Sequence, residues 1–296
     1  MNCLFGDPTT AKELPLIDAA AACGCEYYVI DAGWYAPGEW WDSVGEWKEC
    51  RDRFPNGIKE VTDYIRKKGM VPGVWLELEV MGINCEKAKK APDDWFFVRH
   101  GKRVYDRSRY QLDFRNPAVI EHVNEVIDRV VKEYGVGYIK MDYNIEPGIG
   151  TEIGAESVGQ GLLEHEKAYL NWLDGVFARY PDLVIENCSS GGLRMDYALL
   201  SRYSIQSTSD QEDYRNFATI AANSPAGVTP EQAAIWSYPM RQGDKEEVIY
   251  NMVNAMLFRI HQSGHLAELP QERLALVKEG IACYKTICQD IRQALP

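Results

Sequence analysis

Short apolar runs alternate with longer amphipathic stretches along most of the chain. The runs predict strands at residues 27–31, 71–77, 136–142, 183–187, 204–209, 233–236 and 265–269. Between them, apolar residues recur three or four positions apart and predict helices at residues 8–22, 57–68, 119–134, 162–180, 196–202, 246–262 and 271–295. Strands that alternate with helices at this spacing form parallel β/α units. Because the runs are apolar throughout and end in polar residues, the pattern favours a TIM-type (β/α)8 barrel.

The start of the chain does not supply a clear first strand for that barrel. The pattern gives seven strands, whereas a complete barrel has eight, and the chain opens on a helix. We therefore expect the first strand to be either the short run 2–5 or missing. No repeat, low-complexity tract or linker interrupts the pattern, so we predict a single catalytic domain over residues 1–296.

Composition and charge narrow the choice of partner. The 296 residues are 46% hydrophobic and 26% charged, as is ordinary for a globular protein, and carry a formal net charge of −12. This charge argues against nucleic acid or an anionic membrane surface as a partner. No apolar run approaches the length of a membrane span. A neutral substrate fits the charge, and no metal or other cofactor is predicted.

The cysteines and histidines do not form a recognisable metal site. The eight cysteines include no CxxC pair, which argues against bound zinc. His122 and His165 fall in predicted helices, where we expect them at the surface rather than as ligands. The first residues lack the basic and apolar parts of a signal peptide. We therefore expect reduced thiols and a cytoplasmic protein.

Polar residues gather where the predicted strands end. They are Asp31, Glu77 with Glu79, Lys140 with Asp142, Glu186 to Cys188, and Ser209 with Asp210. Because the carboxyl ends of parallel strands meet at one barrel mouth, these side chains should lie close together. Two carboxylates on different strands are what glycoside hydrolysis needs, one as nucleophile and one as acid/base, roughly 5–6 Å apart if the anomeric configuration is retained. Lys140 shares a strand face with Asp142 and would keep it ionised; the alternative for Lys140 is a salt bridge inside the barrel.

Aromatic and glycine residues supply two further signals. Tryptophans lie on or after the first two predicted strands, at Trp34, Trp40, Trp41, Trp47 and Trp75. Aromatic rings pack against the C–H faces of sugars, although we expect two or three of these tryptophans to belong to the core. The turn C-S-S-G-G at 188–192 predicts that the backbone there closely approaches another group, whose identity the sequence does not give. A phosphate cradle is the alternative, but no lysine follows in the required position.

Several segments together resemble the catalytic barrel of the bacterial α-galactosidases of glycoside hydrolase family 36. Residues 138–144 (Y-I-K-M-D-Y-N) are similar to the family's nucleophile motif, K-W-D-M-N. Residues 188–196 (C-S-S-G-G-L-R-M-D) are similar to C-x-S-G-G-G-R-x-D, and 209–213 (S-D-Q-E-D) to the acid/base segment S-D-x-T-D.

Three earlier segments extend the resemblance over nearly the whole chain. Residues 29–34 are similar to D-D-G-W, and 74–79 are similar to W-x-E-P-E. Residues 107–113 resemble the segment that supplies a substrate-binding arginine, with Arg109 at the matching position.

The resemblance implies a retaining α-glycosidase, with α-galactosides as the expected substrate. It implies that Asp142 is the nucleophile, which forms a covalent glycosyl-enzyme, and that Asp210 is the acid/base. Asp213 is the alternative acid/base; the spacing from Cys188 favours Asp210. The expected substrate-binding residues are Asp31, Trp34, Trp75, Arg109, Lys140, Asn144, Cys188, Gly191 and Arg194.

The chain also departs from the family pattern. Ala32 stands where the family has the second aspartate of D-D-G-W, which helps to bind the 4- and 6-hydroxyls of galactose. A related α-glycoside, such as an α-N-acetylgalactosaminide, is therefore an alternative substrate. Met141 replaces the usual tryptophan beside the nucleophile. Typical members also carry a β-sandwich and a C-terminal β domain, which residues 1–296 are not expected to contain. Family members often form tetramers through those regions, so we do not carry over their oligomeric state.

Two alternatives of other classes stay open. A barrel with Ala32 and no flanking domains could bind carbohydrate without turning it over. A metal-dependent isomerase or lyase could use Glu77, Glu79 and Asp142 to hold Mg²⁺. Activity that survives EDTA would exclude the second alternative.

Overall fold

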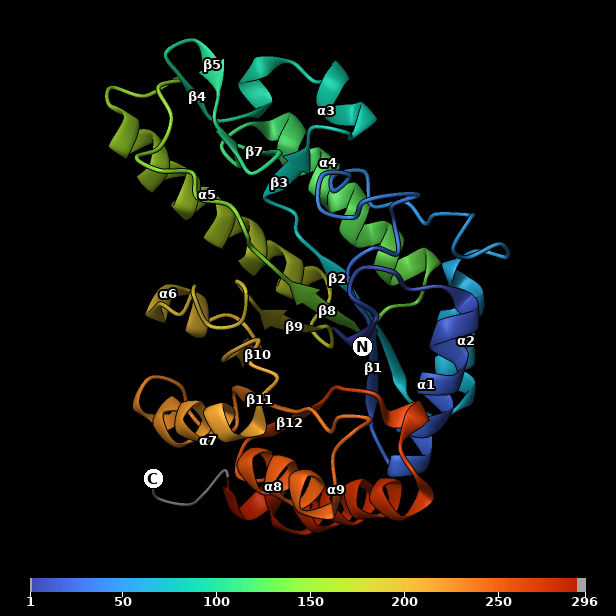
Figure 1. Cartoon of the computed structure of the whole chain (residues 1–296). Coiled ribbons are helices and arrows are strands. Elements are labelled where there is room, and N and C mark those ends of the chain that lie inside the picture. The colour runs from blue at the N-terminus through green and yellow to red at the C-terminus, as the bar shows by residue number, and fades with distance from the viewer. Residues whose placement is uncertain (1, 292–296) are drawn as a thin grey trace.

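Seven parallel strands form one curled sheet at the centre of the molecule. The computed structural model describes residues 2–291 and is shown in Figure 1. Along the sheet, the strands of the described residues are β1 (Tyr27–Ile30), β2 (Val71–Leu76), β8 (Tyr138–Met141), β9 (Val184–Asn187), β10 (Ile205–Ser207), β11 (Ala233–Ser237) and β12 (Arg259–Gln262). All neighbouring pairs are parallel. This confirms the predicted (β/α)8 class, with β1 and β12 as the two edges of the sheet.

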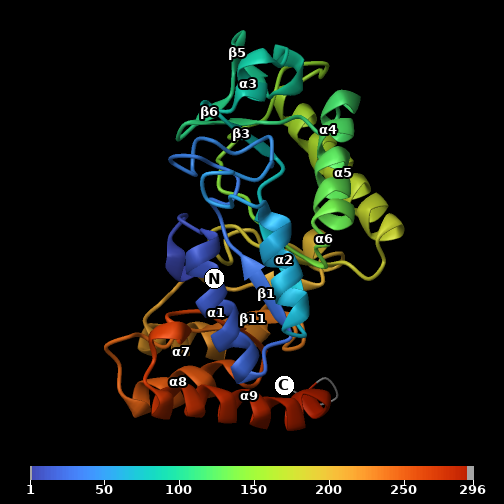
Figure 2. The ribbon, with the colours of Figure 1, turned by 90° about the vertical axis from the view of Figure 1, so that its right-hand side faces the viewer.

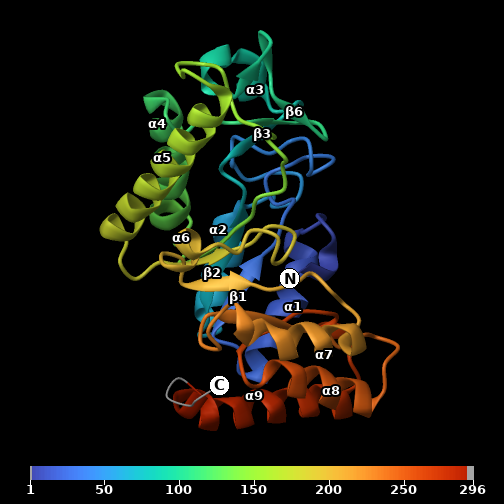
Figure 3. The same ribbon diagram turned by 90° about the vertical axis from the view of Figure 1, so that its left-hand side faces the viewer.

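The larger helices cover the outside of the sheet. They are α1 (Thr10–Cys23), α2 (Ile58–Lys67), α4 (Pro117–Asp128), α5 (Val158–Arg179), α7 (Tyr214–Asn223), α8 (Lys245–Ala255) and α9 (Gln271–Ile291). Figure 2 looks onto α1 and α2, and Figure 3 looks onto α5 from the other side. Helices α8 and α9 pack together at the lower end of Figure 1. Among the described residues, no helix is long and apolar enough to cross a membrane.

Local sequence explains most of these helices. In α2, Ile58, Val61 and Ile65 recur on one face, and all three are fully buried. Helix α1 is capped by Thr9, whose hydroxyl accepts from the amide of Lys12, and it ends at Gly24 in a left-handed conformation. The predicted final helix, 271–295, runs over Gln271–Ile291, and its last four residues lie outside the described part of the chain.

The last predicted strand was wrong. The expected helix 246–262 ends at Ala255, and residues Arg259–Gln262 form β12, which pairs with β11. Residues Leu266–Glu268, expected as strand, form a 3-10 turn (η5). The helical pattern of the sequence continues past Ala255, but pairing with the buried strand β11 overrides the local helix propensity there. The run 2–5 likewise gives a 3-10 turn, η1 (Asn2–Leu4), and no barrel strand.

A small lobe between β2 and α4 was not predicted. It contains β3 (Val80–Gly82), α3 (Glu86–Lys90), the 3-10 turn η2 (Asp93–Trp95), β4 (Val98–Arg99), β5 (Lys102–Arg103), β6 (Tyr105–Asp106) and β7 (Arg109–Gln111). Its strands are antiparallel, in the order β3-β7-β6 with a separate β4–β5 pair, and it forms the top of the molecule in Figure 1. These strands are two or three residues long, too short to leave a periodic pattern in the sequence. The lobe matters because β7 carries Arg109.

The remaining short elements complete the connections. They are the π-helical turn η3 (Arg129–Glu133), which continues α4, the short helix α6 (Tyr197–Leu200) and the 3-10 turn η4 (Ser224–Ala226). The expectation that His122 and His165 lie at the surface was wrong, because both are buried. His122 contacts the carbonyl of Gly45, and His165 lies against Glu79.

Candidate active site

Asp142 lies just past the end of β8 and is held by three donors. One carboxylate oxygen, Oδ2, accepts from the indole N–H of Trp75 at 3.0 Å. The other, Oδ1, accepts from the backbone amides of Tyr143 at 2.8 Å and Ser190 at 3.3 Å. The side chain is nearly buried, with 8% exposed. These contacts fix the orientation of the carboxylate, as a nucleophile requires.

Lys140 on β8 forms an ion pair with Asp31, which follows β1. The Lys140 ammonium lies 3.5 Å from Asp31 Oδ2 and 5.8 Å from the centre of the Trp236 ring. Burial is the largest single influence on Asp31 and would raise its pKa, but the Lys140 charge acts together with the hydrogen bonds from the Ala32 amide and from Lys140, and the net result is a lowered pKa. Burial opposes the charge on Lys140 too, yet the surrounding acidic groups, Asp31 first, raise the pKa of Lys140 well above its usual range. Both groups are therefore charged at neutral pH.

Asp210 follows β10 and remains open to solvent. The loss of hydration within the walls of the site raises the pKa of its carboxyl to about 6, with Lys140 opposing the rise and Asp142 and Asp31 adding to it. A carboxyl with this pKa can hold a proton in mildly acidic solution and give it up in a reaction.

Asp213, the alternative acid/base, caps helix α7. Its Oδ1 accepts from the backbone amide of Arg215 at 2.8 Å, and its Oδ2 lies 2.9 Å from the Arg215 guanidinium. The hydrogen bond from Arg215 lowers the pKa of Asp213 to about 2. Asp213 therefore carries no proton to donate near neutral pH.

The turn 188–192 joins the two carboxylates. Ser190 contacts Asp142 through its amide, while Gly191, at φ +84°, lies against the backbone of Ser209 and Asp210. A Cβ on Gly191 would meet Ser209 Cα at 2.5 Å and Asp210 N at 2.7 Å. This confirms the predicted close backbone approach. Cys188 is fully buried at the start of the turn, and burial, followed by the Asp142 charge, raises its pKa well above the usual thiol range.

Arg109 reaches the site from the small lobe. Its guanidinium lies 2.5 Å from Glu77 and 3.5 Å from the centre of the Trp41 ring, and its Nε donates to the Trp41 carbonyl at 2.8 Å. Arg109 is fully buried, and its Nη2 has no hydrogen-bond partner among the described residues. Arg109 therefore keeps one donor unsatisfied beside the candidate site.

Glu77 is a site residue that the sequence reasoning noticed but did not select. It follows β2, is fully buried and accepts from the backbone amide of Asn144 at 2.5 Å as well as from Arg109. Burial raises the pKa of Glu77 to about 7; Arg109 opposes the rise and Asp142 adds to it. The sequence signals were its place at a strand end and in the segment that resembles W-x-E-P-E, both of which Glu79 shares.

Two predicted site residues have their polar groups engaged with other partners. Trp34 is fully buried, and its indole N–H donates to the Trp75 carbonyl at 2.9 Å. Arg194 forms ion pairs with Glu79 and Glu166. We leave both out of the site that we propose. Three of the five tryptophans belong to the core, as expected: Trp34, Trp47 and Trp75.

Both glutamates among the candidate Mg²⁺ ligands form ion pairs with arginines. Glu77 pairs with Arg109 and Glu79 with Arg194. Within residues 2–291, no group of three or more histidine, cysteine or carboxylate side chains is arranged to hold a metal ion. The charge of each glutamate is thus balanced without a metal.

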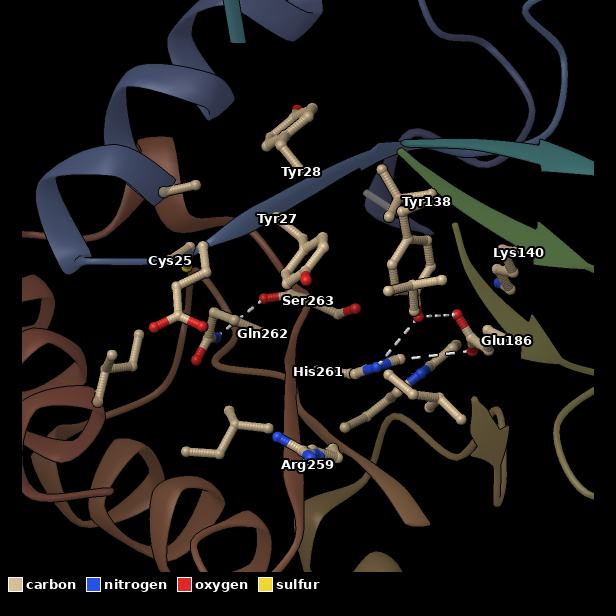
Figure 4. Close-up of a pocket in the computed structure, with 18 of the residues that line it drawn as sticks. Cys25, Tyr27, Tyr28, Tyr138, Lys140, Glu186, Arg259, His261, Gln262 and Ser263 are labelled. Atoms are coloured by element: carbon tan, nitrogen blue, oxygen red, sulfur yellow. Dashed lines mark hydrogen bonds and ion pairs between the residues drawn. The ribbon is translucent and has the colours of Figure 1, made fainter. Parts of the chain in front are cut away.

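A cavity of about 360 Å³ lies in the barrel between the edge strands β1 and β12. Figure 4 shows its polar wall, where Tyr138 donates to Glu186 at 2.7 Å and His261 lies 3.7 Å from the same carboxylate. Asp31 and Lys140 also line the cavity, whereas Asp142 and Asp210 do not. The cavity therefore adjoins the candidate site on its inner side but is not the space between the two carboxylates.

The chain is similar in sequence to a family of known proteins. The sequence profile of the family described as Melibiase matches residues 3–293. Alpha-galactosidase AgaA of Geobacillus stearothermophilus is 31% identical over 71% of this chain, and Alpha-galactosidase Mel36A of Lactobacillus acidophilus is 29% identical over 61%. These matches span only 29% and 25% of the two relatives, so the aligned region is roughly a quarter of their length.

Solved structures show the same fold. The GH36 α-galactosidase AgaA with raffinose superposes with a TM-score of 0.85 over 95% of this chain and 40% of that chain, at 22% identity. TtGalA, an α-galactosidase from Thermus thermophilus, gives a TM-score of 0.72 over 95% of this chain and 60% of that chain, at 19% identity.

Proposed function

Because the chain belongs to the melibiase family, within glycoside hydrolase family 36, we propose that it is a retaining α-glycosidase that hydrolyses terminal, non-reducing α-galactosides. One observation carries the proposal. A buried carboxylate held by three donors, Asp142, shares a supporting turn with a carboxyl whose pKa is about 6, Asp210. A fixed nucleophile and a titratable acid are the two parts that a retaining mechanism needs.

In the first step, a carboxylate oxygen of Asp142 attacks the anomeric carbon. The bond to the glycosidic oxygen breaks as Asp210 gives that oxygen its proton, and the leaving alcohol departs. The sugar is then esterified to Asp142 with inverted configuration.

In the second step, Asp210 is ionised and accepts a proton from water. The water oxygen attacks the anomeric carbon and the bond to Asp142 breaks, which frees the sugar. Two inversions give net retention, and Asp210 ends protonated for the next cycle.

We propose that the charged pair of Asp31 and Lys140 binds sugar hydroxyls, with Trp75, Asn144, Cys188 and Gly191 as the walls that place them. Because Arg109 is fully buried, we propose that its unpartnered Nη2 acts on the substrate through an ordered water, since buried donors are rarely left unpaired. No metal or cofactor enters these steps.

The relatives' names and ligands point to the substrate class. The similar proteins are named α-galactosidases, and AgaA has been solved with raffinose and with stachyose. One residue favours a second candidate. Ala32 is buried and offers no carboxylate to a 4- or 6-hydroxyl, so the alternative substrate is an α-N-acetylgalactosaminide or another α-glycoside cleaved by the same mechanism.

The remaining partners follow from charge and cysteine chemistry. The net charge of −12 does not suit nucleic acid or an anionic surface, so we propose an oligosaccharide or simple glycoside as the only ligand class. All eight cysteines are free thiols, which fits a reducing compartment, and we propose a cytoplasmic location on that basis.

A panel of p-nitrophenyl α-glycosides tests the proposal. We expect the α-galactoside to be hydrolysed in the presence of EDTA, with α-galactose as the first product detected by NMR. Turnover of the N-acetylgalactosaminide alone would select the second candidate. Sugar binding without turnover would support a carbohydrate-binding barrel, and loss of activity in EDTA would support a metal-dependent enzyme.

A further inference from the structure

Glu77 uses its two carboxylate oxygens to join two separate parts of the molecule. Oε1 accepts from the backbone amide of Asn144, two residues past Asp142, and Oε2 accepts from the guanidinium of Arg109 on β7 of the small lobe. Glu77 itself is fully buried at the end of β2, so it has no direct access to a ligand in the open mouth. Its influence on the site must pass through these two partners.

The first partner leads to the Asp142 carboxylate. Asn144 Oδ1 accepts from the amide of Ser190 at 3.0 Å and from its hydroxyl at 2.7 Å. The same Ser190 amide lies 3.3 Å from Asp142 Oδ1. Glu77 thus holds the backbone of Asn144, and the Asn144 side chain holds a donor of Asp142.

The second partner leads to the other wall of the site. Trp41 covers the face of the Arg109 guanidinium and takes its Nε hydrogen bond, while Glu77 takes the bond from Nη1. With two sides of the planar group fixed, the direction of the free Nη2 is fixed as well. Glu77 therefore fixes the position of the small lobe relative to the segment that carries Asp142.

We infer that Glu77 is a positioning residue, which aligns the nucleophile segment with the Arg109 wall without touching the sugar. This inference rests on the proposed function, because Asp142 must be the nucleophile for the alignment to affect turnover. A purely structural ion pair makes a different forecast. Its loss would lower stability and leave the kinetics of the folded enzyme unchanged.

Glu247 on α8 provides a matched control. It is also a buried glutamate that accepts a backbone amide, that of Met240 at 2.8 Å, and faces an arginine, Arg273, at 3.8 Å. Helix α8 lies at the lower end of Figure 1, away from the small lobe. The substitutions Glu77→Gln and Glu247→Gln therefore remove the same charge from similar surroundings.

The experiment measures the melting temperature, kcat and KM on p-nitrophenyl α-galactoside for the wild type and both variants. Replacing Glu77 by glutamine places an amide N–H₂ against Arg109 or Asn144, both of them donors, so we expect kcat/KM to fall at least tenfold, mainly through kcat. We expect Glu247→Gln to lower the melting temperature but to keep kcat/KM within about twofold of the wild type. Wild-type kinetics in folded Glu77→Gln would overturn the inference.

A second variant covers the case in which Glu77→Gln does not fold. Asn144→Ala keeps the Glu77–Arg109 pair and removes only the link to Ser190, and we expect kcat to fall there too, with KM within about threefold. An unchanged kcat in Asn144→Ala would overturn the inference. If the wild type itself turns over no glycoside, the proposed function fails first and the inference falls with it.

Discussion

The two sides of the candidate site differ in how they hold their carboxyl groups. On the side of β2, β8 and β9, Asp142 is nearly buried and each of its oxygens has a donor. On the side of β10, Asp210 is open to solvent, and its pKa of about 6 comes from its surroundings. A nucleophile benefits from being immobile, whereas an acid/base must change its protonation twice per cycle. This difference is the basis on which we propose Asp142 as the nucleophile and Asp210 as the acid/base.

The largest effect should come from the immobile side. Asp142→Asn keeps the size and most contacts of the side chain but removes the nucleophilic charge, so we expect kcat to fall on the order of 10⁴-fold. The assay is hydrolysis of p-nitrophenyl α-galactoside, together with sugar binding by calorimetry, which should survive. Turnover within tenfold of the wild type would remove Asp142 from the nucleophile role.

A smaller loss should follow when the turn between the two sides is distorted. In Gly191→Ala, the added methyl group meets Ser209 and Asp210 backbone at a residue with φ +84°. We expect kcat/KM to fall on the order of 10²-fold, with a loss of stability of about 1–3 kcal/mol. Chemical denaturation and steady-state kinetics measure the two effects.

Gly175 in helix α5 is the control for this substitution. A Cβ there meets nothing within 4 Å. Gly175→Ala should raise stability by about 0.5–1 kcal/mol, because alanine favours the helix, and should leave the kinetics unchanged. If Gly191→Ala behaved like Gly175→Ala, the turn would not connect the two carboxylates functionally.

The protonation of Asp210 should determine how kcat/KM depends on pH. Free enzyme must carry the proton on Asp210 to begin the cycle, so kcat/KM should fall about tenfold per pH unit above the pKa of about 6. Lys140 lowers that pKa, so Lys140→Met should move this basic limb to higher pH while reducing the maximal rate. A limb that stays in place in Lys140→Met would contradict the assignment of the limb to Asp210.

The smallest effect is expected for Asp213→Asn, and its comparison with Asp210→Asn tests which residue is the acid/base. Asp213→Asn keeps a side-chain oxygen at the α7 cap but loses the charge that pairs with Arg215. We expect a modest decrease in melting temperature and a kcat within about threefold of the wild type. Asp210→Asn, in contrast, should slow substrates with poor leaving groups far more than activated aryl glycosides, because only the former need the proton. The reverse pattern would exchange the two residues.

The sequence was informative wherever a property belongs to a local stretch. The alternation of apolar runs and amphipathic helices predicted the class of the fold, and six of the seven strands of the described sheet lie within or at the predicted ranges. The motif around Asp142 and the glycine turn at 188–192 also carried their own signals. The position of the seventh strand was predicted wrongly, because β12 has a helical sequence pattern and becomes a strand only by pairing with β11.

The sequence by itself therefore determined the class of the fold, the strand ends that carry polar groups and the carboxylates that could do chemistry, because period and motif are properties of short segments. Only the tertiary structure decided which carboxylate is fixed and which is free to titrate. Asp210 and Asp213 are both acidic residues of one segment. Burial within the site raises the pKa of Asp210, whereas the hydrogen bonds from Arg215 at the helix cap lower the pKa of Asp213. Burial and hydrogen bonding depend on segments far apart in the chain, as Glu77, Arg109 and Asn144 show.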